Sequence, residues 1–154
     1  MKLNYIIIPL IAVLVAVVGG YLTSGNMSWY RTLNLPSIAP AGWFIGLVWN
    51  VIFILTTISA LIVWNTMQKS DNFSIIIGLF VVNALLNVFW SFLFFNQHLI
   101  NAAMVEAGLL GLTVYVLIFL IWRFSPLAAG LLVPYAVWTT FATYLNYLIW
   151  LLNR

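Results

Sequence analysis

The sequence predicts an all-α membrane protein built as a bundle of five transmembrane helices. Of its 154 residues, 66% are hydrophobic and only 5% are charged, whereas ordinary soluble domains carry about 25% charged residues. Because a water-facing surface cannot be built from so few charged residues, lipid must be the main solvent. The chain also contains five stretches of about 20 mostly apolar residues, which is the length of a membrane-spanning helix.

Composition also narrows the range of partners and chemistry. The five Lys and Arg residues stand against two Asp and Glu residues, and they are too few and too scattered to form a nucleic-acid-binding patch. We therefore expect no nucleic acid partner. The chain has no cysteine, which excludes disulfides, thiolate metal sites and a cysteine nucleophile.

The first predicted span covers residues 4–22 and the second covers residues 42–67. The apolar run that follows Lys2 resembles a signal peptide, but we interpret it as the first membrane helix. Ala12 and Gly20 lie on the same face of that helix, together with Ala16 between them. Such a small-residue face allows two helices to approach closely in lipid.

Residues 23–41 connect these two spans and are unusually apolar for a linker. Proline at positions 36 and 40 forces extended or turn geometry on the preceding residues. The connector contains Trp29, and Trp43 follows it at the start of the second span. We interpret residues 23–41 as a lid over a binding site, with Trp29, Pro36, Pro40 and Trp43 as its characteristic residues.

The third predicted span, residues 73–96, carries polar side chains on one face. Asn83, Asn87 and Ser91 follow one another at intervals of one helical turn, and such groups cannot sensibly face lipid. They either form interhelical hydrogen bonds, which contribute about 0.6 kcal/mol each in membranes, or line a cavity that holds the polar part of a ligand. Because Trp90 adjoins them, we favour the cavity.

The fourth predicted span covers residues 101–122 and contains Glu106, the only acidic residue within any span. An intramembrane carboxyl group is costly, so Glu106 is a functional candidate. A structural role is the alternative, with the carboxyl group reaching the interface or bonded in its neutral form to a neighbour. Small residues at 103, 107 and 111 form a second stripe suited to close helix packing.

The fifth predicted span covers residues 127–152, and we expect Pro134 to kink it. The chain contains eight tryptophans. Trp49, Trp90 and Trp138 lie inside predicted helices, which suits a pocket or core packing. The others lie near helix ends and fit an interfacial aromatic belt; they are Trp29, Trp43, Trp64, Trp122 and Trp150.

Motifs for other chemistry are missing from the sequence. His98 stands alone, so no metal site is expected. There is no nucleophile with a base beside it, no paired carboxylates and no glycine-rich phosphate loop. Hydrolysis and ATP-driven transport are therefore poorly supported.

Three groups of residues resemble the TspO/translocator-protein family of tryptophan-rich sensory proteins, which includes the peripheral benzodiazepine receptor. The first follows the first span and comprises Trp29-Tyr30, Leu33, Leu35-Pro36, Pro40, Trp43 and Val48-Trp49. The second lies in the third span and comprises Asn83, Asn87, Trp90-Ser91 and Phe94-Phe95. The third begins before the fifth span and comprises residues 125–129, Leu131-Leu132, Pro134-Tyr135, Trp138, Phe141-Ala142 and Leu145-Asn146.

The resemblance implies a receptor, sensor or transporter that binds porphyrins such as protoporphyrin IX, and benzodiazepine-type ligands, in a pocket beneath the first loop. No obligatory cofactor is implied. Partners would be the ligand, the bilayer and a second copy in a homodimer, and the expected location is a bacterial cell membrane. Carried over by position, the ligand-binding residues would be Trp49, Asn83, Asn87, Trp90, Trp138, Ala142 and Asn146.

Two other functions stay open. Some bacterial members of the family are reported to degrade protoporphyrin in light, which would make Trp49 and Trp138 the reactive residues. Alternatively, the chain is a small transporter that couples to protons through Glu106. The chain departs from the family pattern at Ile38 and Ala41 in the lid and narrowly lacks the sterol-associated motif around Tyr147.

Overall fold

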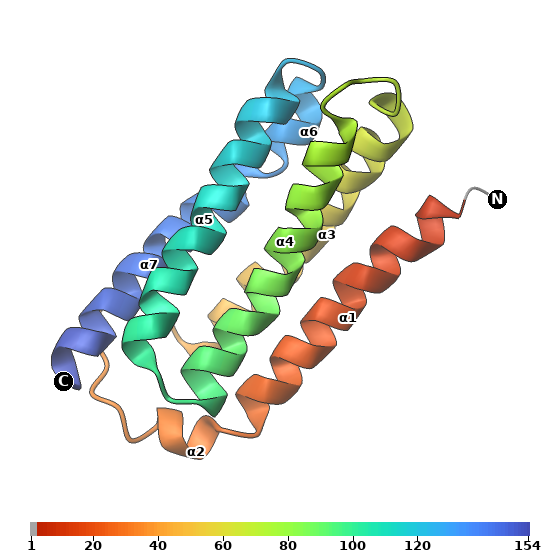
Figure 1. Ribbon diagram of the computed structural model, residues 1–154. Coiled ribbons are helices and arrows are strands. Elements are labelled where there is room, and N and C mark those ends of the chain that lie inside the picture. Colours follow the sequence, from red (N-terminus) through yellow and green to blue (C-terminus); the bar gives the residue numbers. More distant parts are fainter. Residues whose placement is uncertain (1–2) are drawn as a thin grey trace.

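The computed structural model describes residues 3–154, which form a bundle of long antiparallel helices (Figure 1). Five of its helices are long and apolar enough to cross a membrane, which confirms the predicted fold class. The elements in chain order are α1 (Asn4–Ser24), α2 (Met27–Tyr30), α3 (Gly42–Thr66), α4 (Phe73–Ser91), the π-helical turn η1 (Phe92–Asn96), α5 (Ile100–Trp122), α6 (Pro126–Gly130) and α7 (Val133–Leu152).

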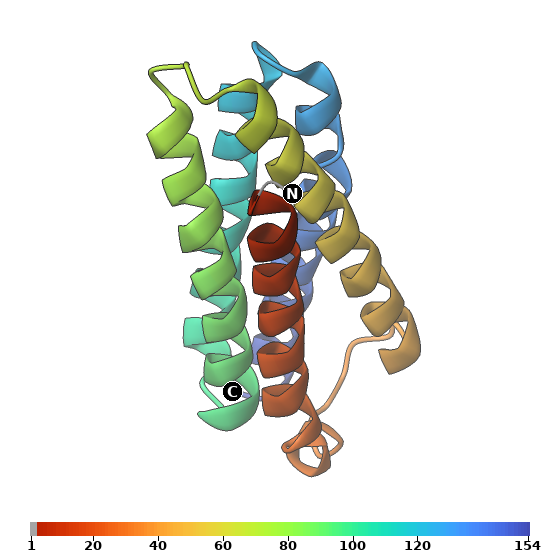
Figure 2. The same cartoon turned by 90° about the vertical axis from the view of Figure 1, so that its right-hand side faces the viewer.

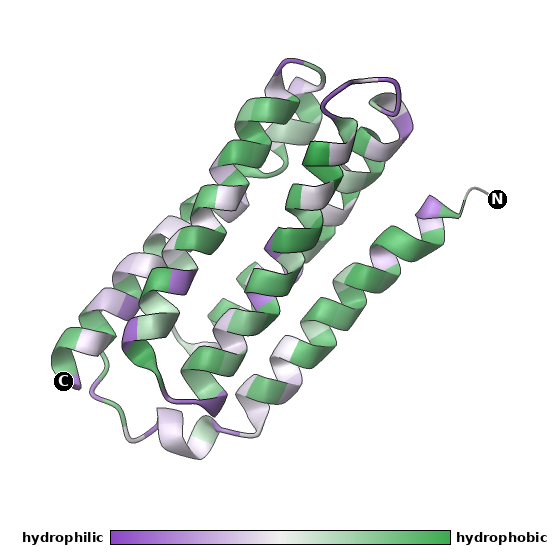
Figure 3. Ribbon diagram, in the orientation of Figure 1, coloured by the Kyte–Doolittle hydropathy of each residue, from purple (hydrophilic) through white to green (hydrophobic). Residues whose placement is uncertain are grey.

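The long helices surround a common interior. Helix α1 packs against α3 and α4, α5 packs against α4 and α7, and α3 reaches α6 and α7. Figure 2 shows α1 in front of the gap between α3 and α4. Hydrophobic residues cover the long helices, and hydrophilic residues gather at the connecting loops (Figure 3). This arrangement leaves lipid as the solvent of the outer faces.

Helix α1 is the least integrated of the five. Asn4 at its start is its only buried residue, and its side-chain amide donates to Oδ1 of Asn65 on α3 at 3.3 Å. By contrast, α5 buries residues along its whole length against α4 and α7. The interior is therefore better closed on the α5 side than on the α1 side.

The fifth span is interrupted where we expected a kink. Helix α6 ends at Gly130, and α7 begins at Val133, so Pro134 lies in the first turn of a new helix. Proline is tolerated there because its missing N–H has no partner in a first turn. Ser125 caps α6, with its Oγ accepting from the backbone N–H of Ala128 at 3.2 Å.

The third span ends in the π-helical turn η1. The backbone N–H of Gln97 donates to the carbonyl of Phe92 at 2.9 Å, one residue further back than in an α-helix. Phe94 and Phe95 in this turn are buried. His98 then adopts a φ of 57°, the left-handed conformation that ends a helix sharply. The π-helical turn thus positions Phe94 and His98, which contact Trp29 of the lid.

The small-residue stripe of α5 is buried within the chain. Ala103 and Ala107 are buried, and a Cβ atom on Gly111 would lie 3.2 Å from Oγ1 of Thr139 on α7. Glycine at this position therefore permits the close approach of α5 and α7. The stripe thus packs α5 against α7 within one chain, and homodimerisation remains a proposal.

Candidate functional site

A network of hydrogen bonds crosses the interior and joins α4, α5 and α7. The Tyr135 hydroxyl donates to Oδ1 of Asn83 at 3.0 Å and accepts from Nδ2 of Asn87 at 3.2 Å. The Asn83 amide in turn donates to Oγ1 of Thr113 at 2.8 Å. We call these four residues the upper polar tier. Each member bonds at least one other, as the great majority of buried polar groups do.

The sequence left two interpretations open for Asn83 and Asn87, interhelical hydrogen bonds or the lining of a cavity, and the structure shows both. Asn83 and Asn87 bond other helices, and both also line a cavity. Sequence reasoning missed Tyr135 and Thr113 as site residues. The signal for Tyr135 was present, because a tyrosine inside a span needs a hydrogen-bond partner when it is buried.

The cavity lies between α1, α3 and α4, with the upper polar tier at one wall, and has a volume of about 160 Å³. Pockets for drug-sized ligands typically measure about 300–1,000 Å³. A ligand of that size therefore requires the surrounding helices to separate. The lining residues are Ile7, Ile8, Ile11, Ala12, Val15, Phe53, Thr56, Thr57, Ala60, Trp64, Ile77, Phe80, Val81, Asn83, Ala84, Asn87 and Tyr135.

The inner tryptophans pack in aromatic groups rather than on this cavity. Trp49 meets Tyr135 edge-on with ring centroids 5.9 Å apart. Trp138 lies 6.4 Å from Phe44 of α3, and Trp90 stacks on Phe94 at 5.3 Å. Only two of the predicted ligand-binding residues thus line the cavity. Those that do not are Trp49, Trp90, Trp138, Ala142 and Asn146.

Several polar atoms nearer to the lid are buried without a protein partner. They are Nε1 of Trp90 and of Trp138, Oδ1 of Asn146, and both carboxyl oxygens of Glu106. Glu106 is 4% exposed and therefore faces neither lipid nor the interface. An unpaired buried polar group typically costs about 1–3 kcal/mol. These atoms mark a place where the chain alone does not complete its hydrogen bonding.

The lid closes the bundle at the end where α4 meets α5. Its short helix α2 places Trp29 on His98, with the rings stacked at a centroid distance of 3.9 Å, and edge-on to Phe94 at 5.6 Å. Trp29 is therefore packed against the bundle. By contrast, Trp43 is 73% exposed at the start of α3, as an interfacial anchor would be. Pro36 lies half-buried between these two positions.

A pair of asparagines fastens the lid to the end of α7. The backbone N–H of Asn34 donates to Oδ1 of Asn153 at 2.9 Å, and Nδ2 of Asn153 donates to the Asn34 carbonyl at 3.0 Å. We call this pair the lid clasp. Pro40, half-buried, then leads the chain from the lid into α3. Sequence reasoning did not find the clasp, because its two residues are far apart in the chain.

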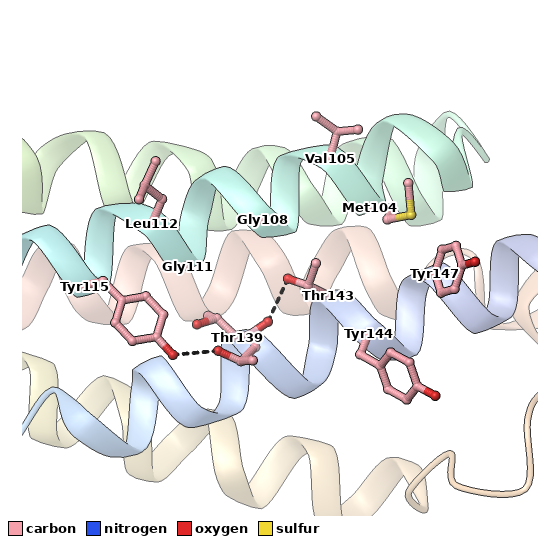
Figure 4. Close-up of a pocket in the computed structure, with 11 residues that line it drawn as sticks. Met104, Val105, Gly108, Gly111, Leu112, Tyr115, Thr139, Thr143, Tyr144 and Tyr147 are labelled. Carbon is pink, nitrogen blue, oxygen red and sulfur yellow. Dashed lines mark hydrogen bonds between the residues drawn. The ribbon is translucent and has the colours of Figure 1, made fainter.

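A larger groove of about 690 Å³ lies on the outer side of α5 and α7. Figure 4 shows Gly108 and Gly111 at its base, and Tyr115 bonds Thr140 across it at 2.8 Å. The groove is open to the membrane and holds none of the predicted site residues. Its lining consists of Met104, Val105, Gly108, Gly111, Leu112, Tyr115, Thr139, Thr140, Thr143, Tyr144 and Tyr147.

Within residues 3–154 no group of three or more His, Asp or Glu side chains is placed to hold a metal ion. The interior instead offers amides, hydroxyls, indole N–H groups and one carboxyl group, framed by aromatic rings. Such a set can bind an organic ligand by stacking and hydrogen bonding.

Comparison with known proteins gives a consistent result. A family model described as the TspO/MBR family matches residues 7–151. The tryptophan-rich protein TspO of Bacillus cereus is 35% identical over 129 residues, covering 83% of this chain and 82% of that protein. TspO of Chlorobaculum tepidum is 35% identical over 136 residues, covering 88% and 86%. The human translocator protein is 30% identical over 135 residues, covering 86% and 80%. With five membrane-spanning helices and these matches, the chain is a multi-pass integral membrane protein and belongs to the TspO/MBR family.

Proposed function

We propose that this protein binds a flat, largely apolar tetrapyrrole of the protoporphyrin IX type, or a benzodiazepine-type ligand, inside its helix bundle. It would act as a receptor or carrier in a bacterial cell membrane. The observation that carries the proposal is the set of buried polar atoms without a protein partner, which belong to Trp90, Trp138, Asn146 and Glu106. They lie among aromatic rings, which suit the faces of a macrocycle.

The aromatic rings and the polar atoms of the interior would make different contacts with such a ligand. Offset stacking on an indole contributes about 0.5–1.5 kcal/mol per aromatic pair beyond area burial. Polar atoms inside an apolar site fix the orientation of a ligand. The name translocator protein, carried by the human relative, accords with a carrier role. Light-dependent breakdown at Trp49 and Trp138, and proton coupling at Glu106, stay predictions from the sequence.

The ligand must displace helix α1, because the cavity of about 160 Å³ is too small for a porphyrin. Helix α1 is suited to this movement, since beyond Asn4 it has no buried residue. Its packing against α3 and α4 therefore holds less buried surface than that of α5 does. We expect the site to open on the α1 side.

Titration of the detergent-solubilised protein with protoporphyrin IX tests the proposal. Porphyrin should quench tryptophan fluorescence with saturation. Trp138→Ala should weaken binding by roughly tenfold, which corresponds to the loss of about 1.4 kcal/mol of stacking and packing.

The matched control is Trp122→Ala, which removes one tryptophan that is 55% exposed at the opposite end of the bundle. It should leave the affinity unchanged. Quenching that does not saturate, or equal losses in the two variants, would contradict a porphyrin site at Trp138.

A further inference from the structure

The cavity between α1, α3 and α4 lies in the half of the bundle away from the lid. Its lining residues on α3 begin at Phe53, near the middle of the helix, and end at Trp64, near the end that is remote from the lid. On α1 they end at Val15, well before that helix reaches the lid after Ser24. Figure 2 shows α1 covering the gap between α3 and α4. None of the residues that carry the proposed function lines this cavity.

Thr56 lines the cavity and has a hydroxyl group without a hydrogen-bond partner. Its Oγ1 is buried and unpaired, although a threonine inside a helix can bond a carbonyl one turn back. Its neighbour Thr57 does so with the carbonyl of Phe53 at 2.7 Å, and every other threonine of residues 3–154 also makes a hydrogen bond. The side chain of Thr56 is thus the only threonine of the described chain that no protein group satisfies.

Asn83 on α4 lies at nearly the same depth as Thr56 on α3. The ring contact of Trp64 with Phe73, at a centroid distance of 5.4 Å, sets the register of α3 against antiparallel α4. Thr56 and Val81 lie equally far from that contact along their helices, so Thr56 lies within one turn of Asn83 in depth. The amide of Asn83 has two N–H donors, and the upper polar tier uses one of them. A polar group in the cavity therefore meets a hydroxyl on one helix and an amide on the next.

The rest of the cavity suits a single aromatic ring. Phe53, Trp64 and Phe80 contribute rings to its lining, and aliphatic side chains of α1 contribute much of the remainder. The volume of about 160 Å³ is close to that of an engineered apolar cavity of about 150 Å³ that binds one benzene molecule. A buried water typically makes about three hydrogen bonds, so water fits only beside Thr56 and the upper polar tier.

We propose that this cavity is a second binding site, which takes one single-ring aromatic molecule that carries a hydroxyl group, such as a phenol. The ring packs among the aromatic and aliphatic side chains. The hydroxyl donates to Oγ1 of Thr56 and accepts the second N–H of Asn83. Because such a ligand fits with α1 in place, its binding does not depend on the displacement of α1 that a tetrapyrrole requires. The inference therefore goes beyond the proposed function and does not rest on it.

Fluorine NMR tests the site with two probes, 4-fluorophenol and fluorobenzene, which lacks the hydroxyl. Each is titrated into the detergent-solubilised protein without porphyrin, and protein-free micelles measure its partition into detergent. The wild-type protein should bind 4-fluorophenol saturably, and unlabelled phenol should displace it. Ala84→Leu places a larger side chain in the cavity and should abolish saturable binding of both probes.

Two threonine variants test the hydrogen bond of the ligand. Thr56→Val keeps the shape of the side chain, and it should lower the preference for 4-fluorophenol over fluorobenzene by roughly fivefold, the effect of one ordinary hydrogen bond. Thr57→Val is the matched control, because Thr57 also lines the cavity but its hydroxyl already bonds Phe53. It should keep the full preference.

Unsaturable behaviour of 4-fluorophenol with the wild-type protein would overturn the inference, because the cavity would then hold only water or lipid chains. Saturable binding that persists in folded Ala84→Leu, or an unchanged preference in Thr56→Val, would overturn it as well. If Ala84→Leu does not fold, Ala60→Leu, which enlarges a cavity residue of α3, decides in the same way. The porphyrin titration is independent of all these outcomes, so the proposed function stands or falls separately.

Discussion

The Tyr135 hydroxyl joins α7 to two amide side chains of α4, since it bonds both Asn83 and Asn87. Tyr135→Phe keeps the ring against Trp49 but leaves an amide oxygen and an amide N–H unpaired. We expect it to reduce the free energy of unfolding by about 1–2 kcal/mol, between the average membrane hydrogen bond and the cost of unpaired buried groups. Unfolding in mixed detergent micelles at increasing denaturing-detergent fraction measures this loss.

Tyr115→Phe is the matched control for Tyr135→Phe. The Tyr115 hydroxyl bonds Thr140 on the outer, exposed side of the bundle, and losing it should cost less than about 0.5 kcal/mol. A loss of stability as large as that of Tyr135→Phe would show that the upper polar tier is no stronger than an exposed pair.

Individual side chains were only partly predictable from the sequence. The spacing of Asn83 and Asn87 was enough to place both inside the bundle, because lipid excludes unpaired amides. It could not show that Tyr135 completes their bonding, since that depends on how α4 and α7 are aligned. The unpartnered state of Asn146 likewise follows from tertiary packing, which no local pattern encodes.

Among the helices, α1 is the one whose displacement the proposed binding requires. The contact of Asn4 with Asn65 sets Ala12 opposite Thr57, and both line the cavity. Cross-linking Ala12→Cys to Thr57→Cys with a short bis-maleimide should abolish or strongly slow protoporphyrin binding, because the helices can no longer separate. The natural chain has no cysteine, so the reagent has no other thiol to attack.

A second cross-link controls for chemistry unrelated to α1. Gly108→Cys and Thr143→Cys join α5 to α7, where a Cβ on Gly108 would already lie 3.8 Å from Thr143. Joining these helices should leave binding intact, because the site is not expected to open between them. Unimpaired binding after complete α1–α3 cross-linking would show that the ligand reaches the interior by another route.

The long helices were predicted from the sequence, but of their two interruptions only the one beside Pro134 was. Length and hydropathy fix a span because a bilayer demands about 20 apolar residues. The predicted disruption at Pro134 is confirmed as a full break rather than a kink, because α6 ends at Gly130, four residues before the proline, and α7 begins at Val133. The π-helical turn at Phe92–Asn96 had no sequence signal. Its extra residue is accommodated by the packing of Phe94 and Phe95.

At the scale of the whole molecule, the lid lies at one end of the bundle and the α3–α4 connection at the other (Figure 1). The lid and the α3–α4 connection lie on opposite sides of the membrane, because the single span α3 separates them. Single cysteines at two exposed positions, Ser37→Cys in the lid and Gln68→Cys in the other loop, should react with a membrane-impermeant maleimide from opposite sides of sealed vesicles. Labelling of both from one side would contradict the assignment of α3 as a membrane span.

The balance of charges does not decide which side is which. Lys69 and Arg123 lie at one end of the bundle, and Arg31 and Arg154 lie at the other. The sequence adds Lys2 to the first group, because it precedes the first predicted span; it lies outside the described residues. Three positive charges against two is too small a difference for the positive-inside rule. The labelling experiment therefore also gives the absolute orientation, which determines whether the lid opens to the cytoplasmic side.

The lid clasp joins two segments that are far apart in the sequence, Asn34 and Asn153. The end of α7 is thereby part of the cover over the interior. A protein fused after Arg154 would be attached next to the lid clasp, and its bulk or its linker would disturb the hydrogen bonds between Asn34 and Asn153. One fused ahead of the first helix would lie at the opposite membrane face. Purification tags and fluorescent reporters therefore belong at the start of the chain whenever ligand uptake is to be measured.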